Sequence, residues 1–334
     1  MSRIVVLGGG SWGTALAIVL SRARRKHDVS LWVHDPALAE SVARHRENHR
    51  YLPGHRLPAE VHIHSDILKA STDAKIFLGA IPTLYARAAY SALATNFSPR
   101  SIFVSAAKGL EPVTRKRMSQ VVSDVFPPGS APRFAVLSGP SFAAEAAAGQ
   151  PTAVVLASGD AGLLSDLQEE FAAPNFRVYT NQDVLGVELA GAMKNVIAIA
   201  AGVCQGLGLG YNPQAALITR GLAEMSRLAA ALGAQPETLT GLAGLGDLVL
   251  TCTGALSRNR QVGVELGKGR TLKEILGGMR MVAEGVGTTA ALLSLAREAK
   301  VELPISEQVA EILHHGKPPG EAIRDIMDRP QRRE

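Results

Sequence analysis

The chain has 334 residues, of which 46% are apolar and 19% charged, and its formal net charge is +5. This composition is typical of soluble globular proteins, and the length favours two domains over one core. The positive charge is modest and scattered, which suits small anionic ligands and argues against a nucleic-acid partner. The only cysteines, Cys204 and Cys252, lie in apolar runs. They predict buried, reduced thiols and a cytoplasmic location.

A strand, a glycine turn and a helix open the chain. The apolar run from Arg3 to Leu7 is followed by Gly-Gly-Gly-Ser-Trp-Gly at 8–13 and by helical residues 14–20. This order is the context of a dinucleotide-binding fingerprint. Gly8 would form the tight turn, Gly10 would let the backbone approach a pyrophosphate, and Gly13 would let helix and strand pack closely. Free amides at the helix start would bind the phosphates. The alternative is a chance glycine turn.

A second strand, residues 29–33, ends in His34-Asp35. Asp35 lies near the position where an acid binds the ribose 2′-hydroxyl of NAD, while His34 could instead accept the 2′-phosphate of NADP, helped by Arg44 and Arg46. Asp35-Pro36 also fits a helix cap followed by proline at the first helical position. The choice between NAD and NADP therefore stays open.

Further short strands alternate with helices up to residue 179, which predicts a doubly wound, mostly parallel sheet. The strands are expected at 61–64, 75–80, 101–106, 134–137, 152–157 and 176–179. Ligands bind at the carboxyl ends of such strands, where segments 107–111 and 138–143 lie. Lys108 would offer a charge to an anionic substrate, and Gly139 and Ser141 would offer free amides and a hydroxyl. Ordinary loops are the alternative for both segments.

The nine histidines leave a gap between residues 65 and 313. His45 and His49 are spaced i, i+4, but no nearby cysteine or HExxH pattern accompanies them, so no metal site is predicted. If the second half of the chain carries the chemistry, its proton donor is not a histidine.

Residues 184–203 are apolar except for Glu188, Lys194 and Asn195. Their pattern predicts a buried helix that carries Lys194 into the interior, where an ammonium needs a charged partner or a lowered pKa. A membrane span is rejected, because the charged residues near its centre would be costly and no other segment resembles one. A lysine that extends to the surface is the remaining alternative. Glu188 lies on another helical face and cannot neutralise Lys194.

Helices are expected from here to the end of the chain, which places the domain boundary between residues 182 and 183. In the helix from Asn212 to about Leu232, Arg220 and Glu224 can pair as a surface salt bridge. A glycine-rich loop from Gly241 then presents Asp247. Asp247 is the candidate partner of Lys194, with an ordinary helix cap as the alternative.

Ser257-Arg258-Asn259-Arg260 opens a helix that ends near Gly267. A serine cap with a guanidinium on the first turn makes a site for a dianion, because bidentate hydrogen bonds add to the helix-end amides. A plain cap with solvated arginines is the alternative. Further along, Val282-Ala283-Glu284-Gly285 offers another acid beside a glycine.

Together these motifs resemble the bacterial NAD(P)-dependent glycerol-3-phosphate dehydrogenases over nearly the whole chain. The resemblance is carried by residues 8–13, 108–111, 138–143, 192–196, 243–248 and 257–260. It implies a Rossmann-like domain at 1–182 and an all-helical domain at 183–334, with the active site between them. It also implies NADP or NAD as cofactor, a phosphorylated triose as substrate and a supply of product to glycerophospholipid synthesis.

The resemblance assigns roles to individual residues. Lys194 would donate and accept the proton. The substrate would be held by Lys108, Gly139, Ser141, Lys194, Asp247, Ser257, Arg258 and Asn259. Besides the glycines of the turn, the cofactor would be lined by Ser11, Trp12, His34, Lys108, Ala143, Arg258, Val282 and Glu284.

The expected reaction is reversible reduction of dihydroxyacetone phosphate to sn-glycerol 3-phosphate. Two rival functions are a related two-domain dehydrogenase acting on a 3-hydroxy acid or ketopantoate, and a dinucleotide sensor without chemistry. The Arg258-Asn259 anion site argues against a carboxylate substrate, and the buried lysine argues against a sensor. The residues leave the oligomeric state open, with a homodimer as one expectation.

Overall fold

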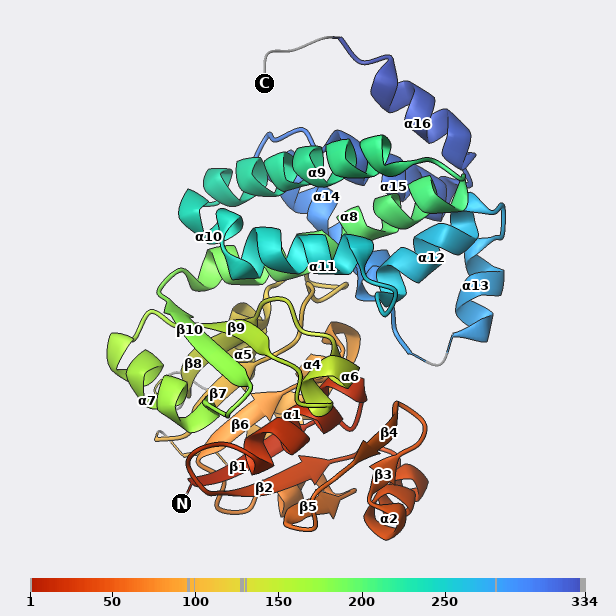
Figure 1. Ribbon diagram of the computed structural model, residues 1–334. Helices are drawn as coiled ribbons and strands as arrows, with labels where there is room; N and C mark the ends of the chain where they lie inside the picture. The colour runs from red at the N-terminus through yellow and green to blue at the C-terminus, as the bar shows by residue number, and fades with distance from the viewer. Residues whose placement is uncertain are drawn as a thin grey trace. The chain divides into compact units, whose positions relative to one another are not determined.

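The computed structural model describes residues 2–94, 97, 98, 100–126, 129, 131–279 and 281–330. The chain forms two compact units (Figure 1). The first consists of the residues up to Glu111 together with Lys116–Glu188, and the second of Pro112–Arg115 together with the residues from Leu189 onward.

The first unit is built on an eight-stranded sheet with the strand order β10-β9-β8-β7-β6-β1-β2-β5. Hydrogen-bonded neighbours run parallel except β8 and β9, which are antiparallel. The predicted doubly wound, mostly parallel sheet is therefore confirmed. In chain order the strands are β1 Ser2–Leu7, β2 His27–Trp32, β5 Val61–His64, β6 Ile76–Gly79, β7 Ile102–Ser105, β8 Arg133–Ser138, β9 Thr152–Ala157 and β10 Phe176–Asn181.

Helices cover both faces of this sheet because its strands are apolar on both faces. Ile4 and Val6 of β1 pack into one core cluster, whereas Val5 and Leu7 pack into another. Successive side chains of a strand point to opposite faces, so a continuous apolar run needs cover on both. The first cluster includes residues of α1 (Ser11–Ser21), α2 (Pro36–His45), α6 (Ala143–Ala147) and α7 (Ala161–Phe171), and the second includes residues of α3 (Ile67–Ala70), α4 (Thr83–Leu93) and α5 (Met118–Val125).

A short antiparallel pair, β3 (Glu47–Asn48) and β4 (Leu52–Arg56), was not expected from the sequence. It holds Asn48 in the interior, where the side-chain amide donates to Gly9 O and to Thr14 Oγ1, each at 2.9 Å. The pair thereby ties down the glycine turn and the start of α1. A strand of two residues is too short to give a periodic signal.

The regular secondary structure in the described part of the second unit consists of helices. Its helices are α8 Val184–Gly206, whose first turn belongs to the first unit, α9 Tyr211–Ala231, α10 Pro236–Thr240, the π-helix η2 Leu242–Gly246, α11 Asp247–Thr253, α12 Arg258–Gly267, α13 Leu272–Gly278, α14 Glu284–Glu298, α15 Pro304–His315 and α16 Pro319–Met327. The helix expected at 184–203 is confirmed. Among the described residues it is the one helix long and apolar enough to cross a membrane, but 83% of its apolar window is buried inside the protein. It is a core helix.

Two glycines bring α8 and α12 into backbone contact. A Cβ on Gly202 would lie 2.0 Å from Arg260 O, and one on Gly263 would lie 2.0 Å from Ile199 O. Only residues without a side chain allow such an approach. The contact places α12 along the C-terminal half of α8, beyond Lys194.

Two sequence interpretations in this unit were wrong. The segment from Gly241 is not a loop: residues 242–246 form a π-helix that continues into α11. Glu224 makes no surface salt bridge, because it is 2% exposed and accepts hydrogen bonds from the amides of Ile305 (2.6 Å) and Ser306 (3.3 Å) at the start of α15. Glu224 owes its burial to a contact 81 positions away in sequence, which periodicity does not report. The π-helix packs against its sequence neighbours α10 and α11.

Candidate active site

Lys194 lies in the middle of α8 and is 5% exposed. Its Nζ donates to Asp247 Oδ1 at 2.5 Å and to Thr251 Oγ1 at 2.9 Å. Asp247 is the first residue of α11 and is 1% exposed. The expected pairing is present, and a lysine that extends to the surface is excluded. A buried charge of this kind persists because a fixed carboxylate and hydroxyl replace its hydration.

Thr251 was missed by the sequence analysis. It follows Asp247 by one helical turn, and its hydroxyl donates to Asp247 O at 2.6 Å, which leaves a lone pair directed at Lys194. The i, i+4 spacing from a candidate acid was the available signal. Together the two side chains fix the ammonium from one face of α11.

Glu188 belongs to a separate cluster. Its carboxylate accepts from Arg117 Nη1 at 2.6 Å and from the Ser119 amide at 2.7 Å, all within the first unit. Burial raises the pKa of Glu188, while Arg117 opposes that shift. The expectation that Glu188 does not neutralise Lys194 is consistent with these partners.

The residue after the lysine extends the network to α12 and α14. Asn195 Oδ1 accepts from Asn259 Nδ2 at 2.9 Å, and Asn259 Oδ1 accepts from the Gly285 amide at 3.0 Å. Both asparagines are buried. Asn259, chosen from the sequence as a substrate ligand, thus also joins three helices around the lysine.

The start of α12 combines a cap with a guanidinium. Ser257 caps the helix by accepting from the Arg260 amide at 3.3 Å, as expected. Arg258 Nη1 donates to Val282 O at 2.8 Å. Burial lowers the pKa of Arg258, and Glu284 opposes that shift, so the two charges lie within electrostatic reach. Arg258, Val282 and Glu284, three of the predicted cofactor residues, are therefore neighbours.

Three predicted residues of the first unit also come together. Lys108 Nζ donates to Gly139 O at 2.8 Å and lies 3.3 Å from Ser141 Oγ, which itself donates to Gly139 O at 2.9 Å. Lys108 follows β7, and Gly139 and Ser141 follow β8, so neighbouring parallel strands deliver them to one edge of the sheet. Ala143 begins α6 just beyond.

The glycine turn has the geometry of the fingerprint. Gly8 has a φ of +122°, and a Cβ on Gly13 would lie 1.9 Å from Gly8 O, so α1 starts against the end of β1. A Cβ on Gly10 would meet nothing within 4 Å. The backbone there is open to a ligand, with the start of α1 next to it. Trp12 Nε1 is buried without a hydrogen-bond partner among the described residues. These features fit a dinucleotide, whose phosphates would meet the free amides at the start of α1.

Asp35 has two roles already. Its Oδ1 caps α2 by accepting from Ala37 N (3.0 Å) and Leu38 N (3.2 Å), and its Oδ2 lies 3.2 Å from Arg50 Nη1. Arg44 instead pairs with Glu40, and Arg46 donates to Val61 O. Arg50, missed from the sequence because it lies beyond α2, is the arginine placed beside the predicted ribose position. His34 is exposed next to it in the chain.

Other chemistries find little support in the described residues. No group of three or more His, Cys, Asp and Glu side chains in them could hold a metal ion. Burial raises the pKa of Cys252, which follows Thr251, to about 12, so its thiol stays protonated near neutral pH. A protonated buried thiol is not a nucleophile.

Comparison with known proteins decides the family. Residues 3–163 match the model of the NAD-dependent glycerol-3-phosphate dehydrogenase N-terminus, and residues 183–324 match that of its C-terminus. Glycerol-3-phosphate dehydrogenase (NAD(P)+) of Koribacter versatilis is 53% identical over 99% of this chain and 98% of its own. The chain belongs to this family. It is accordingly an NAD(P)-dependent oxidoreductase with a Rossmann-like domain followed by a helical one.

Solved structures agree with the assignment of this chain to the glycerol-3-phosphate dehydrogenase family. The glycerol-3-phosphate dehydrogenase of Coxiella burnetii has a TM-score of 0.93 and 39% identity, and the match covers 98% of this chain and 99% of the other. A ketopantoate reductase of Ralstonia eutropha reaches a TM-score of 0.59 at 15% identity, covering 97% and 100%. The second likeness concerns the fold alone.

Proposed function

We propose that this chain reversibly reduces dihydroxyacetone phosphate to sn-glycerol 3-phosphate with NADPH or NADH, and that Lys194 is its proton donor and acceptor. The observation that carries the proposal is the ammonium of Lys194, buried and held by Asp247 at 2.5 Å and Thr251 at 2.9 Å. Acid–base catalysis needs a proton donor that is held in a fixed orientation, and these two contacts hold Lys194 in that way.

Reduction of a carbonyl needs a hydride at carbon and a proton at oxygen. When bound, the reduced nicotinamide supplies the hydride. Lys194 donates the proton from Nζ to the developing alkoxide oxygen and becomes a neutral amine, which solvent then reprotonates. Asp247 favours the charged lysine before transfer, and Thr251 keeps Nζ oriented. In the reverse direction the neutral amine takes the hydroxyl proton.

The substrate phosphate is assigned to Arg258 and to the start of α12, where Ser257 and Asn259 lie. A guanidinium that binds bidentately, together with helix-start amides, suits a dianion. The hydrogen bonds of Asn259 to Asn195 and Gly285 support a positioning role for that side chain as well. Lys108, Gly139 and Ser141 are assigned to the triose portion of the substrate.

For the cofactor, residues 1–182 are proposed as the binding domain and 183–334 as the substrate and catalytic domain. Gly8, Gly10 and Gly13 would hold the pyrophosphate, and Ser11, Trp12 and Ala143 would line the same part of the cofactor. His34 and Arg50 would hold a 2′-phosphate, and Asp35 would hold a 2′-hydroxyl. Lys108, Arg258, Val282 and Glu284 are assigned to the nicotinamide end.

The first test is loss of reduced-nicotinamide absorbance when purified protein meets dihydroxyacetone phosphate, with NADPH and NADH in parallel. Consumption supports the reaction, and the ratio of the two rates measures cofactor preference. Ketopantoate and a 3-hydroxy acid, the latter assayed with oxidised cofactor, are run as rival substrates. Turnover of these rival substrates alone would contradict the proposal and favour a dehydrogenase that acts on a carboxylate. Cofactor binding without turnover of any of these substrates would favour the other rival function, a dinucleotide sensor without chemistry.

Three further points belong to the proposal. The product feeds glycerophospholipid synthesis, the protein works in the cytoplasm and the chain forms a homodimer. Two free, buried cysteines suit a reducing compartment. Exposed apolar side chains, among them Tyr211 at 88% and Leu256 at 51%, suit an interface in the second unit. Light scattering after size exclusion measures the oligomeric state directly.

A further inference from the structure

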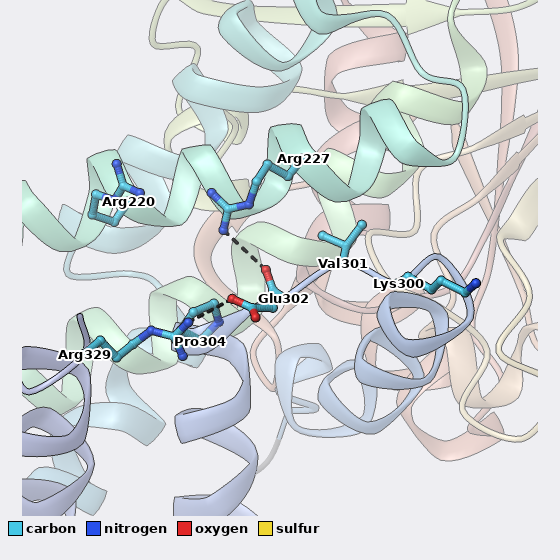
Figure 2. A pocket seen from close by; sticks show the side chains of 7 residues that line it. All are labelled: Arg220, Arg227, Lys300, Val301, Glu302, Pro304 and Arg329. Carbon is cyan, nitrogen blue, oxygen red and sulfur yellow. Dashed lines mark hydrogen bonds and ion pairs between the residues drawn. The ribbon is translucent and has the colours of Figure 1, made fainter. Parts of the chain in front are cut away.

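A pocket of about 430 Å³ opens in the second unit among residues that the proposed reaction does not use. It is lined by Arg220, Arg227, Lys300, Val301, Glu302, Pro304 and Arg329 (Figure 2). The volume lies within the range of small-molecule sites, which is roughly 300–1,000 Å³.

The lining carries an excess of positive charge. Arg220 and Arg227 project from α9, two turns apart on one face, and Arg329 reaches in from beyond α16 (Figure 2). Among the described residues of the lining, Glu302 is the single acid. Its Oε2 accepts from Arg329 at 2.9 Å, and its backbone oxygen accepts from Arg227 at 3.3 Å. Lys300 points its ammonium away from Glu302 (Figure 2). Three guanidiniums against one carboxylate leave the concavity cationic, which concentrates anions there.

The pocket wall is also fixed from beneath. Glu224 lies between Arg220 and Arg227 on the same face of α9 and accepts from the amides of Ile305 and Ser306 and from Ser306 Oγ at 3.1 Å. These bonds hold the backbone that follows Pro304 against α9. A pocket whose two walls are held together in advance loses less entropy when a ligand binds.

We propose that this pocket binds the phosphate group of a small phosphorylated molecule. Paired guanidiniums can bind phosphate oxygens bidentately. A dianion also neutralises the excess positive charge better than a monocarboxylate does. Val301 and Pro304 offer apolar surface to the carbon portion of the ligand. The inference does not rest on the proposed reaction, since the residues are separate.

Calorimetric titration of inorganic phosphate into the full chain without cofactor tests the proposal. The wild type is expected to bind at two classes of site, this pocket and the substrate-phosphate site. The R220A/R227A double variant should keep one class and lose about tenfold or more of its affinity at the other. The matched variant R24A/R56A removes two exposed arginines of the first unit and should retain both classes. Unchanged binding in R220A/R227A, or an equal loss in R24A/R56A, would overturn the inference.

Further arms separate this pocket from the reaction and identify the source of the phosphate. R258A should lose the other class of site; if it does not, the substrate assignment fails while the pocket stands. Unchanged turnover in R220A/R227A verifies folding, and R220Q serves in its place if the double variant does not fold. Sedimentation with phosphatidylcholine vesicles, with and without phosphatidic acid, distinguishes a lipid headgroup from a soluble ester. Arginine-dependent binding to phosphatidic acid indicates the headgroup, and phosphate binding without vesicle binding indicates the soluble ester.

Discussion

The second unit holds one buried lysine charge and one exposed cluster of arginines. Lys194 is 5% exposed and sits within 3 Å of a carboxylate and a hydroxyl, whereas the arginines of the pocket on α9 face solvent. A buried charge loses its hydration, so its partners must be fixed, and that fixed geometry serves proton transfer. An exposed cluster keeps its hydration and can exchange water for an incoming anion. Within one helical unit, burial therefore distinguishes the charge proposed for proton transfer from the charges proposed for anion binding.

The largest expected effect comes from removing the buried charge. Replacing Lys194 by Met should lower kcat by about 10² to 10⁴, because the alkoxide loses its positioned acid. Cofactor affinity, measured by fluorescence titration, should persist. Lys273→Met removes an exposed lysine of the same unit and should leave kcat unchanged. Near-normal turnover in the Lys194 variant would show that this buried lysine is not the proton donor.

The next effect concerns Glu224, the buried carboxyl beneath the exposed pocket. Burial raises its pKa from 4.5 to about 7, against the opposing effect of the amides it binds. Between these two values the folded state retains a proton that the unfolded chain has lost. The free energy of unfolding should therefore fall as the pH rises through this window, by on the order of 3 kcal/mol, and level off above it.

Urea unfolding of wild type and Glu224→Gln at pH 5, 6, 7 and 8 measures this dependence. The wild type should lose stability relative to the variant up to about pH 7. A wild type that gains stability over the same range would mean that the hydrogen bonds from α15 outweigh burial.

Arg258 lies between the two extremes of exposure. Its replacement by Ala should raise KM for dihydroxyacetone phosphate by roughly 10- to 100-fold, because a charge-assisted bidentate contact contributes on the order of 1.5–3 kcal/mol. Turnover at saturation should change less. Arg270→Ala, which removes an exposed arginine of the same unit, should leave KM unchanged. An unaltered KM in the Arg258 variant would refute the dianion assignment.

Thr251 sharpens the comparison within the buried cluster. Thr251→Val keeps the shape but removes the hydroxyl that Lys194 Nζ meets at 2.9 Å. We expect kcat to fall by about tenfold, since one hydrogen bond to a charged group is lost, with a shift in the pH profile of kcat. Thr251→Ser should restore most of the rate. If Val and Ser behave alike, the hydroxyl does not orient the lysine.

The smallest effect is expected at the exposed pair of the pocket. Arg329 and Glu302 are 36% and 60% exposed in their side chains. Arg329→Ala should change the free energy of unfolding by less than about 1 kcal/mol, because solvent screens such pairs. A larger loss in urea unfolding would mean that the pocket contributes to stability as well as carrying charge.

Much of the fold could be predicted from the sequence, because its strands, turns and helices follow local sequence patterns. Apolar strands, the glycine turn and the helix at 184–203 each obey a short-range rule. Features fixed by distant contacts were not predicted: the β3–β4 pair that holds Asn48 and the burial of Glu224. The π-helix before Asp247 was missed for another reason, because glycines favour loops over helices. In the candidate site, Lys194 and Asp247 were found as a charge and an acid within apolar runs. Thr251 and Arg50 were missed, because the i, i+4 spacing of Thr251 from Asp247 is a weak signal by itself and a surface arginine does not report its neighbour.

The sequence by itself determined the sheet-and-helix order, the fingerprint at Gly8 to Gly13 and the apolar helix that carries Lys194. Each follows from residue types over a few turns or a single strand. Only the tertiary structure decided which groups meet: Lys194 with Asp247 across 53 positions, Lys108 with Gly139 across 31, and Glu224 with the start of α15 across 81. Such pairings depend on how helices and strands pack, and packing is set by the shape of the whole core.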